Sequence, residues 1–76
     1  MVTEINKYVI KKVRAKRLEK GFTQSRLAFE LDQSTSFIKQ IESGKYGKKY
    51  NISHLFEIAK ILECGVGEFF PKDNKP

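Results

Sequence analysis

The sequence predicts an all-α protein in which five helices share one compact core. Apolar residues recur at intervals of three and four along most of the chain, which is the period of an amphipathic helix. No window alternates with the period of two that is typical of a half-buried strand. With 39% hydrophobic residues, 6 Phe and no Trp among 76 residues, the chain can build one small core.

Local signals place each helix in order along the chain. Thr23, Ser34 and Asn51 have side chains that accept hydrogen bonds at helix N-termini, so each is expected to begin a helix. Gly44 is expected to end the third helix and Pro71 to stop the fifth. The expected helices cover residues 5–19, 24–31, 35–43, 52–62 and 66–70.

The sequence also predicts one folded domain over residues 1–70 and a flexible polar tail over residues 71–76, PKDNKP. The N-terminus lacks the apolar run of a signal peptide, and no window is long and apolar enough to span a membrane. We therefore expect a cytoplasmic protein. Its single cysteine, Cys64, cannot form an intramolecular disulfide and is expected to be a buried core thiol.

The chain offers no pattern for catalysis, a metal or a cofactor. His54 is the only histidine and has no Cys or acidic pair at ligand spacing, so it is expected near the start of the fourth helix as a surface or cap residue. No Gly-rich phosphate loop or paired-carboxylate motif is present. We expect no enzyme, no metal and no small-molecule effector.

Residues 22–44 carry two short amphipathic helices around a polar turn. Leu27, Ala28 and Leu31 repeat at helical spacing, and Phe37 and Ile38 resume the same period after the turn. Helices this short need a shared core. Ala28 is small enough to let the second helix cross close over the first, which leaves the polar side of the later helix free.

That free side has the chemistry of a major-groove reader. Gln40 can pair with adenine through two hydrogen bonds, and Lys39 can donate to guanine. Thr35 and Ser36 lie in the first turn, which is the part of such a helix that reaches base edges. An ordinary helical bundle also contains amphipathic pairs, so the motif alone leaves both interpretations open.

The stretch from Val13 to Lys45 resembles the lambdoid phage repressor and Cro family, the XRE type of helix-turn-helix. The matching residues are Val13, Arg17, Gly21, Phe22, Thr23, Gln24, Leu27, Ala28, Ile38, Gln40, Ile41, Glu42, Gly44 and Lys45. The likeness continues more loosely through Leu55, Ile58, Ala59, Leu62, Val66, Phe69 and Phe70. It implies a compact five-helix lambda-repressor-like DNA-binding domain.

The resemblance also implies roles for single residues. Gln24 would contact a DNA phosphate, and Arg17 would form a structural ion pair with Glu42. Two positions depart from the family pattern. Asp32 stands where Gly is usual in a left-handed turn, which Asp tolerates at some cost. Arg26 replaces the Glu of a capping box, and we interpret it as a further phosphate contact or an ordinary exposed Arg.

Charge supports a nucleic-acid partner. The formal net charge is +6 and the pI is near 9.6, and Lys45, Lys48 and Lys49 follow the third helix in a loop with Tyr46 and Tyr50. Lys and Tyr in such a loop can contact the DNA backbone without reading sequence. The expected backbone contacts are Gln24, Arg26, Ser34, Ser43, Lys45, Tyr46 and Lys48.

These features predict a sequence-specific, double-stranded DNA-binding transcriptional regulator, most simply a repressor acting as a homodimer on an inverted repeat. The candidates for the dimer interface are Ile61, Val66, Phe69 and Phe70, with one phenylalanine closing the core and the other partly shared. Small members of the resembling family include Cro-like repressors, restriction-modification controllers and antitoxins. The alternative is an antitoxin-type interaction module with secondary DNA binding, although the tail is short for a partner-masking segment.

Overall fold

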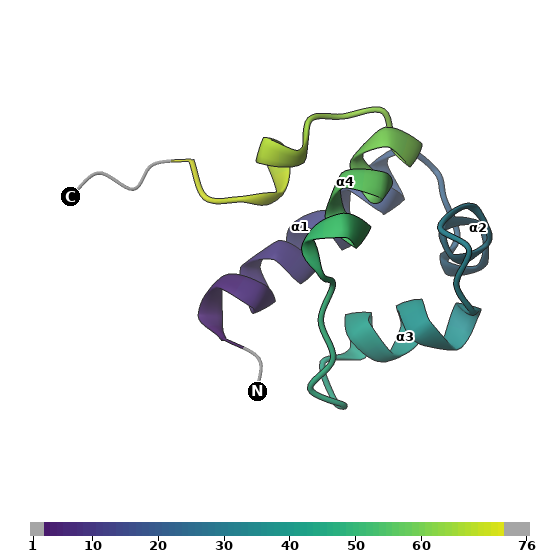
Figure 1. Cartoon of the computed structure of the whole chain (residues 1–76), viewed down its shortest axis with the longest axis horizontal. Coiled ribbons are helices and arrows are strands. Elements are labelled where there is room, and N and C mark those ends of the chain that lie inside the picture. Colours follow the sequence, from purple (N-terminus) through teal and green to yellow (C-terminus); the bar gives the residue numbers. More distant parts are fainter. Residues whose placement is uncertain (1–2, 73–76) are drawn as a thin grey trace.

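The computed structural model of the protein describes residues 3–72. Figure 1 shows its elements in order, which are α1 (Glu4–Glu19), α2 (Gln24–Glu30), α3 (Thr35–Ser43), α4 (Ile52–Ile61) and the 3-10 turn η1 (Val66–Phe69). The part of the chain that the structure describes contains no strand, so the all-α fold class is confirmed. Of the expected polar tail, residues 73–76 lie outside the described range.

The fifth element is a single 3-10 turn rather than the α-helix expected over 66–70. Gly65 and Gly67 lower the helix propensity of this short segment, and Pro71 prevents its extension. A salt bridge fixes the turn to α1, since Lys16 Nζ lies 3.0 Å from Glu68 Oε1. The hydrogen bond from Lys16 is the main cause that holds the pKa of Glu68 below its usual value.

Side-chain caps begin the helices where the sequence predicted them. The Ser34 hydroxyl accepts a hydrogen bond from the backbone N–H of Phe37 at 3.1 Å, and the Thr23 hydroxyl accepts one from Arg26 at 3.0 Å. At α4 the cap is reciprocal. Asn51 Oδ1 accepts from the backbone N–H of His54 at 2.7 Å, and His54 Nδ1 accepts from the backbone N–H of Asn51 at 3.2 Å.

The turn chemistry also follows the sequence. Asp32 adopts a left-handed backbone with φ of 61°, at the position where the resembling family usually has Gly. Gly44 ends α3 with φ of 72°. Asp32 therefore forms the tight turn between α2 and α3, and the 44–50 loop begins at Gly44.

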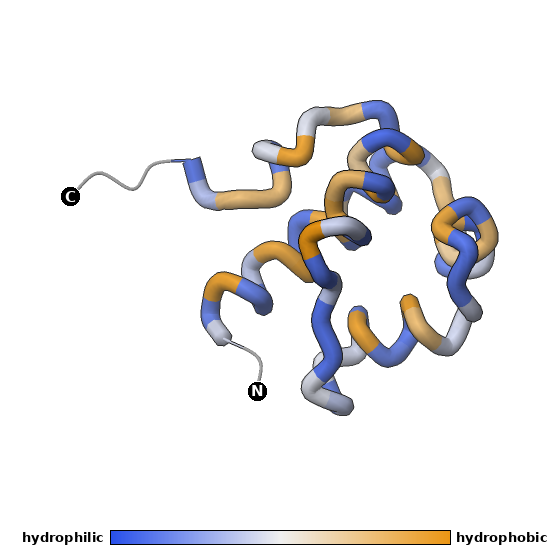
Figure 2. Tube along the Cα trace, viewed as in Figure 1, coloured by the Kyte–Doolittle hydropathy of each residue, from blue (hydrophilic) through white to orange (hydrophobic). Residues whose placement is uncertain are grey.

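All five elements contribute to one core, and α2 packs on α3 and α4. Figure 2 shows the hydrophobic residues of α3 on its upper side, toward α1 and α4. Ala28 is only 1% exposed, which is consistent with its expected role at the close crossing of α2 and α3. The largest fully buried side chains are Phe69, Leu27, Ile38, Ile41, Ile58, Leu62 and Val13.

Phe69 cannot serve as a dimer contact, because its side chain is fully buried within this chain. Phe70, its neighbour, is 37% exposed. Ile61 and Val66 are half-buried and pack against the core. Cys64 is also half-buried rather than fully buried, and burial is the main cause that raises the pKa of its thiol.

Tyr50 is buried, so the sequence-based prediction of a contact between this side chain and the DNA backbone is wrong. Its ring packs edge-on against Phe37 and His54, with centroid distances of 6.2 Å and 6.4 Å. Its hydroxyl is buried without a hydrogen-bond partner in the described part of the chain. Burial, followed by the charge of Glu42, raises the pKa of Tyr50 far above its ordinary value, while Arg17 acts in the opposite direction.

Tyr50→Phe should leave the free energy of unfolding unchanged or raise it by up to about 1 kcal/mol. The substitution keeps the ring and removes a polar group that lacks a partner, and burying such a group costs about 1–3 kcal/mol. Urea unfolding at pH 7 measures the change. A loss of more than about 1 kcal/mol would mean that the hydroxyl makes a stabilising hydrogen bond.

Within residues 3–72, no helix has both the length and the apolar character needed to cross a membrane.

Candidate nucleic-acid interface

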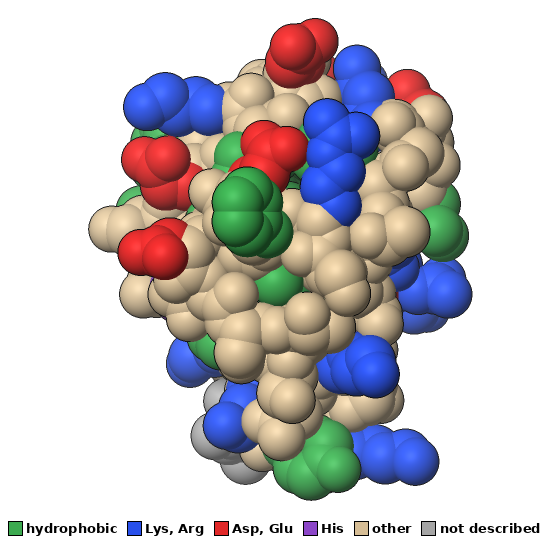
Figure 3. Space-filling view, turned by 90° about the vertical axis from the view of Figure 1, so that its right-hand side faces the viewer, with side chains coloured by type: hydrophobic (Ala, Val, Ile, Leu, Met, Phe, Trp, Pro, Cys, Tyr) green, Lys and Arg blue, Asp and Glu red, His purple; other side chains and the backbone are tan. Residues whose placement is uncertain are grey.

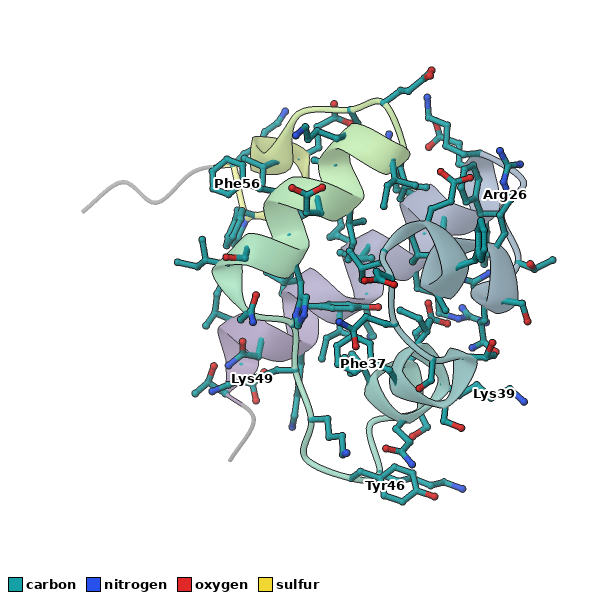
Figure 4. All side chains as sticks on the ribbon, turned by 45° about the vertical axis from the view of Figure 1, so that its right-hand side comes forward. Arg26, Phe37, Lys39, Tyr46, Lys49 and Phe56 are labelled. Carbon is teal, nitrogen blue, oxygen red and sulfur yellow. The ribbon has the colours of Figure 1, made fainter. Side chains whose placement is uncertain are left out.

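The exposed side of α3 carries most of the residues predicted to read bases. Ser36 and Lys39 are exposed, and Gln40 is half-buried, while Ile38 and Ile41 on the opposite side are fully buried. Ser36, Lys39 and Gln40 line a shallow depression together with three residues that follow them, Ser43, Lys45 and Tyr46. Figure 4 shows Lys39 and Tyr46 pointing outward at the edge of the molecule. We call this depression and its six residues the α3 surface.

Charge is distributed unevenly over this side of the molecule. Figure 3 shows basic side chains and no acidic ones in the lower part of the face that it presents, whereas acidic and basic groups mix in the upper part. Uncharged polar groups and backbone occupy much of the centre. Such a surface offers hydrogen bonds flanked by positive charge, which suits an anionic polymer with readable edges.

Thr35, the fourth predicted base-reading residue, lies at the α2 side of the α3 surface. It is half-buried, and its hydroxyl donates to Ser25 Oγ across a distance of 3.4 Å. Ser25 was not among the residues predicted from the sequence. No local sequence pattern points to Ser25, because its contact with Thr35 joins residues ten positions apart on different helices.

Two of the residues predicted to contact the DNA backbone have hydroxyls that form hydrogen bonds at the ends of α3. Ser34 uses its oxygen as the N-terminal cap of α3. Ser43 donates its hydroxyl to the carbonyl of Gln40 at 2.9 Å and accepts the backbone N–H of Lys45 at 3.1 Å. Ser43 therefore shapes the start of the 44–50 loop, and Lys45 and Tyr46 project from that loop, with Tyr46 being 59% exposed.

The structure contains the predicted Arg17–Glu42 ion pair. Arg17 Nε donates to Glu42 Oε2 at 2.9 Å, and Arg17 Nη2 donates to Glu42 Oε1 at 2.8 Å. The two side chains are 6% and 4% exposed. Arg17 Nη1 also donates to the carbonyl of Phe22 at 2.7 Å, so the guanidinium links α1 both to α3 and to the turn before α2. A paired geometry of this kind gives strong, directional hydrogen bonds.

Glu42 also holds Gln24, a contact that the sequence did not reveal. Gln24 Nε2 donates to Glu42 Oε1 at 3.0 Å, and Arg14 Nε lies 3.7 Å from the same oxygen. One carboxylate thereby connects α1, α2 and α3. An amide nitrogen carries two hydrogens, so Gln24 keeps a second donor that this contact does not use.

Arg26 lies away from the α3 surface. Its guanidinium sits 3.9 Å from the centroid of the Phe22 ring, and Arg26 Nε is 3.2 Å from Glu30 Oε2. These residues line a groove with Lys20 and 61–63, at the ends of α1 and α4. Figure 4 shows Arg26 well separated from Lys39. The Arg26 side chain is 57% exposed, and the contact that it makes with Glu30 uses Nε.

Lys48 occupies a different side of the 44–50 loop from Lys45. It lines a groove with Lys7 and Lys11 of α1 beside the end of α3. In the described residues, no three His, Cys, Asp or Glu side chains gather as a metal centre would require.

The short α2 and α3, joined by a tight left-handed turn with the polar side of α3 exposed, have the arrangement of a helix-turn-helix. The helix-turn-helix family model matches residues 13–69, and the chain belongs to this family, in its XRE type. No curated protein sequence matches the chain.

Several solved structures are similar to this chain. A Tyr-to-Phe mutant of the restriction-modification controller protein C.Esp1396I is 32% identical with a TM-score of 0.77, over 91% of this chain and 85% of that one. The controller protein C.AhdI from Aeromonas hydrophila is 24% identical with a TM-score of 0.73, over 88% and 97%. Hydroxypropylphosphonic acid epoxidase from S. wedmorenis is 19% identical with a TM-score of 0.76. The chain covers 36% of that epoxidase, so this likeness concerns the fold alone.

Proposed function

We propose that the protein binds a specific inverted-repeat site in double-stranded DNA as a homodimer and regulates transcription from a promoter near it. The observation that carries the proposal is the α3 surface, where Ser36, Lys39 and Gln40 share the exposed side of a helix whose opposite side is fully buried. A helix presented in this way fits the major groove, which is wide enough to admit it.

The side chains divide into readers and positioners. Gln40 can bind adenine and Lys39 guanine, while Thr35 and Ser36 can donate to several bases. Lys45 and Tyr46 lie at the edge of the α3 surface, where the sugar-phosphate backbone borders the groove. Gln24 keeps one amide N–H for a phosphate while Glu42 holds the other. Occupation of a promoter by such a complex would block polymerase and repress transcription.

The relatives favour one context among small regulators. The 32% identity to a restriction-modification controller extends over most of both chains. It supports a controller role for this protein over an antitoxin-type interaction module.

Random-site selection with duplex DNA tests the base-reading proposal. The expected result is one enriched motif of two inverted half-sites about one helical turn apart. The affinity for that motif should fall steeply as salt rises from 50 to 200 mM, because phosphate contacts release counterions. Enrichment of no motif, with equal binding to all duplexes, would overturn the proposal.

The second copy is proposed to bind an apolar surface remote from α3. Ile52 is 72% exposed and Phe56 is 55% exposed, and they are four residues apart on one side of α4. Figure 4 shows Phe56 on the opposite side of the molecule from Lys39. Phe70 adds a third partly exposed apolar side chain. A dimer that covers Ile52 and Phe56 would leave both α3 surfaces free for DNA.

Phe56→Glu should convert the dimer to a monomer and lower the affinity for the paired site by at least tenfold, because a carboxylate would lose its water at the interface. Sedimentation equilibrium measures the mass. Phe29→Glu is the matched control, since Phe29 is 83% exposed on α2 and should leave the mass unchanged. A monomeric parent protein, or identical masses for both variants, would contradict the proposed interface.

A further inference from the structure

Three basic residues follow one side of α1. Lys7, Lys11 and Arg14 are spaced four and three residues apart, which places them on the same helical face. All three are exposed, and the side chains of Lys7 and Arg14 are 64% and 57% exposed. We call these three residues the α1 stripe.

The α1 stripe lies beside α3 and the loop that follows it. Lys7 and Lys11 line a groove with Lys48, and Ser43 and Gly44 at the end of α3 form its other side. Arg14 continues the stripe to the Arg17–Glu42 ion pair, with its Nε 3.7 Å from Glu42 Oε1. Figure 1 shows the N-terminal half of α1 and the 44–50 loop in the same part of the molecule.

The positive charge of this groove is poorly compensated. Glu42 is the carboxylate that lines it, and Arg17 already binds both Glu42 oxygens. The ion pairs of residues 3–72 do not involve Lys11 or Lys48. Lys7 lies 4.0 Å from Glu4, whose side chain is 95% exposed, and such a pair contributes little in water.

Another side of α1 has a different electrostatic character. Lys12 lines a groove that contains Glu68, and Lys16 lies 3.3 Å from Glu19 and 3.0 Å from Glu68. Cations and carboxylates alternate there, so that side lacks a continuous positive field. The α1 stripe is thus distinguished from the other lysines of the same helix by its position next to α3 and by the scarcity of acidic neighbours.

We infer that the α1 stripe, together with Lys48, is a further phosphate-binding surface that follows the DNA backbone beside the groove entered by α3. The inference rests on the proposed function, since it takes the duplex on the α3 surface as its starting geometry. Its ammonium and guanidinium groups would contact phosphates without reading bases. The stripe would therefore add affinity and salt dependence equally on all sequences.

The test compares two double variants that remove the same net charge. Lys7→Ala/Lys11→Ala removes two members of the stripe, and Lys12→Ala/Lys60→Ala removes two exposed lysines from other surfaces of α1 and α4. Each phosphate contact adds about 0.9 to the slope of log affinity against log salt on B-DNA. The stripe variant should lose about 1.8 from this slope for each bound subunit, or about 3.6 for the dimer, and the control variant much less.

The measurement is a fluorescence-anisotropy titration of the selected duplex and of a scrambled duplex at four salt concentrations. The stripe variant should lose about the same factor in affinity on both duplexes at low salt and keep the motif preference of the parent. A third duplex, with uncharged methylphosphonates beside the half-site, should bind the parent protein more weakly than the selected duplex does, and should change the affinity of the stripe variant much less. Thermal unfolding should confirm that both variants remain folded.

The outcomes separate this inference from the proposed function. If the parent protein selects a motif but the two double variants have equal salt slopes, the stripe does not contact DNA and the inference fails alone. If the parent protein shows no motif preference, the proposed function fails. A stripe variant that changes the preferred motif would also overturn the inference, because phosphate contacts carry no base information.

Discussion

Glu42→Ala should lower the free energy of unfolding by about 3–5 kcal/mol, the cost typical of breaking a buried ion pair by removing one partner. The substitution leaves the Arg17 guanidinium, in a side chain only 6% exposed, without its carboxylate. It also removes the acceptor for the Gln24 amide. Urea unfolding followed by circular dichroism at pH 7 measures the change.

Two further variants make this result specific. Glu57→Ala removes a carboxylate from the surface of α4, where it lies 3.8 Å from an exposed lysine, and should change the free energy of unfolding by less than about 1 kcal/mol. Arg17→Met/Glu42→Leu removes both charges, so its cost should be smaller than the sum of the single substitutions. A loss below about 1 kcal/mol for Glu42→Ala would show that the pair is not effectively buried.

Gln40→Ala should relax base preference at one position in each half-site by about 1–3 kcal/mol, the discrimination given by a good bidentate contact. Lys39→Ala should do the same at a neighbouring position. Competition titrations against all single-base variants of the selected motif measure both effects. The salt slope should stay nearly unchanged for Gln40→Ala, because an uncharged amide displaces no counterions.

Lys45→Ala is the contrasting variant for this series. Lys45 lies in the loop at the edge of the α3 surface, so its removal should weaken binding to all duplexes alike and reduce the salt slope by about 1 for each bound subunit. Equal losses on every sequence from Gln40→Ala, Lys39→Ala and Lys45→Ala would reduce the α3 surface to a nonspecific basic patch.

Much of the fold could be predicted because its signals are local. Thr23, Ser34 and Asn51 cap helices within three residues of themselves, and the cap and turn positions fix most helix boundaries. Asp32 in the left-handed turn follows from the family pattern together with backbone sterics. The α3 face follows from a periodicity that spans only nine residues, since its buried and exposed positions alternate with the helical repeat.

The features that sequence analysis missed depend on contacts between distant parts of the chain. Gln24 and Glu42 are 18 positions apart, and no periodicity connects them. Tyr50 was predicted to contact the DNA backbone, although an aromatic residue directly before a helix cap often packs inward. Arg26 has a local partner four residues away in Glu30, and that spacing could have predicted its position.

The contacts of Glu42 with Arg17 and Gln24 limit how the DNA specificity of the protein can be changed. Ser36, Lys39 and Gln40 point outward and make few internal bonds through their side chains, so a designer could vary them to suit another operator. Glu42 belongs to the same helix, but its carboxylate fixes the angle at which that helix is presented. A transplanted recognition helix would therefore need to carry its Glu42 into a host that already supplies counterparts of Arg17 and Gln24.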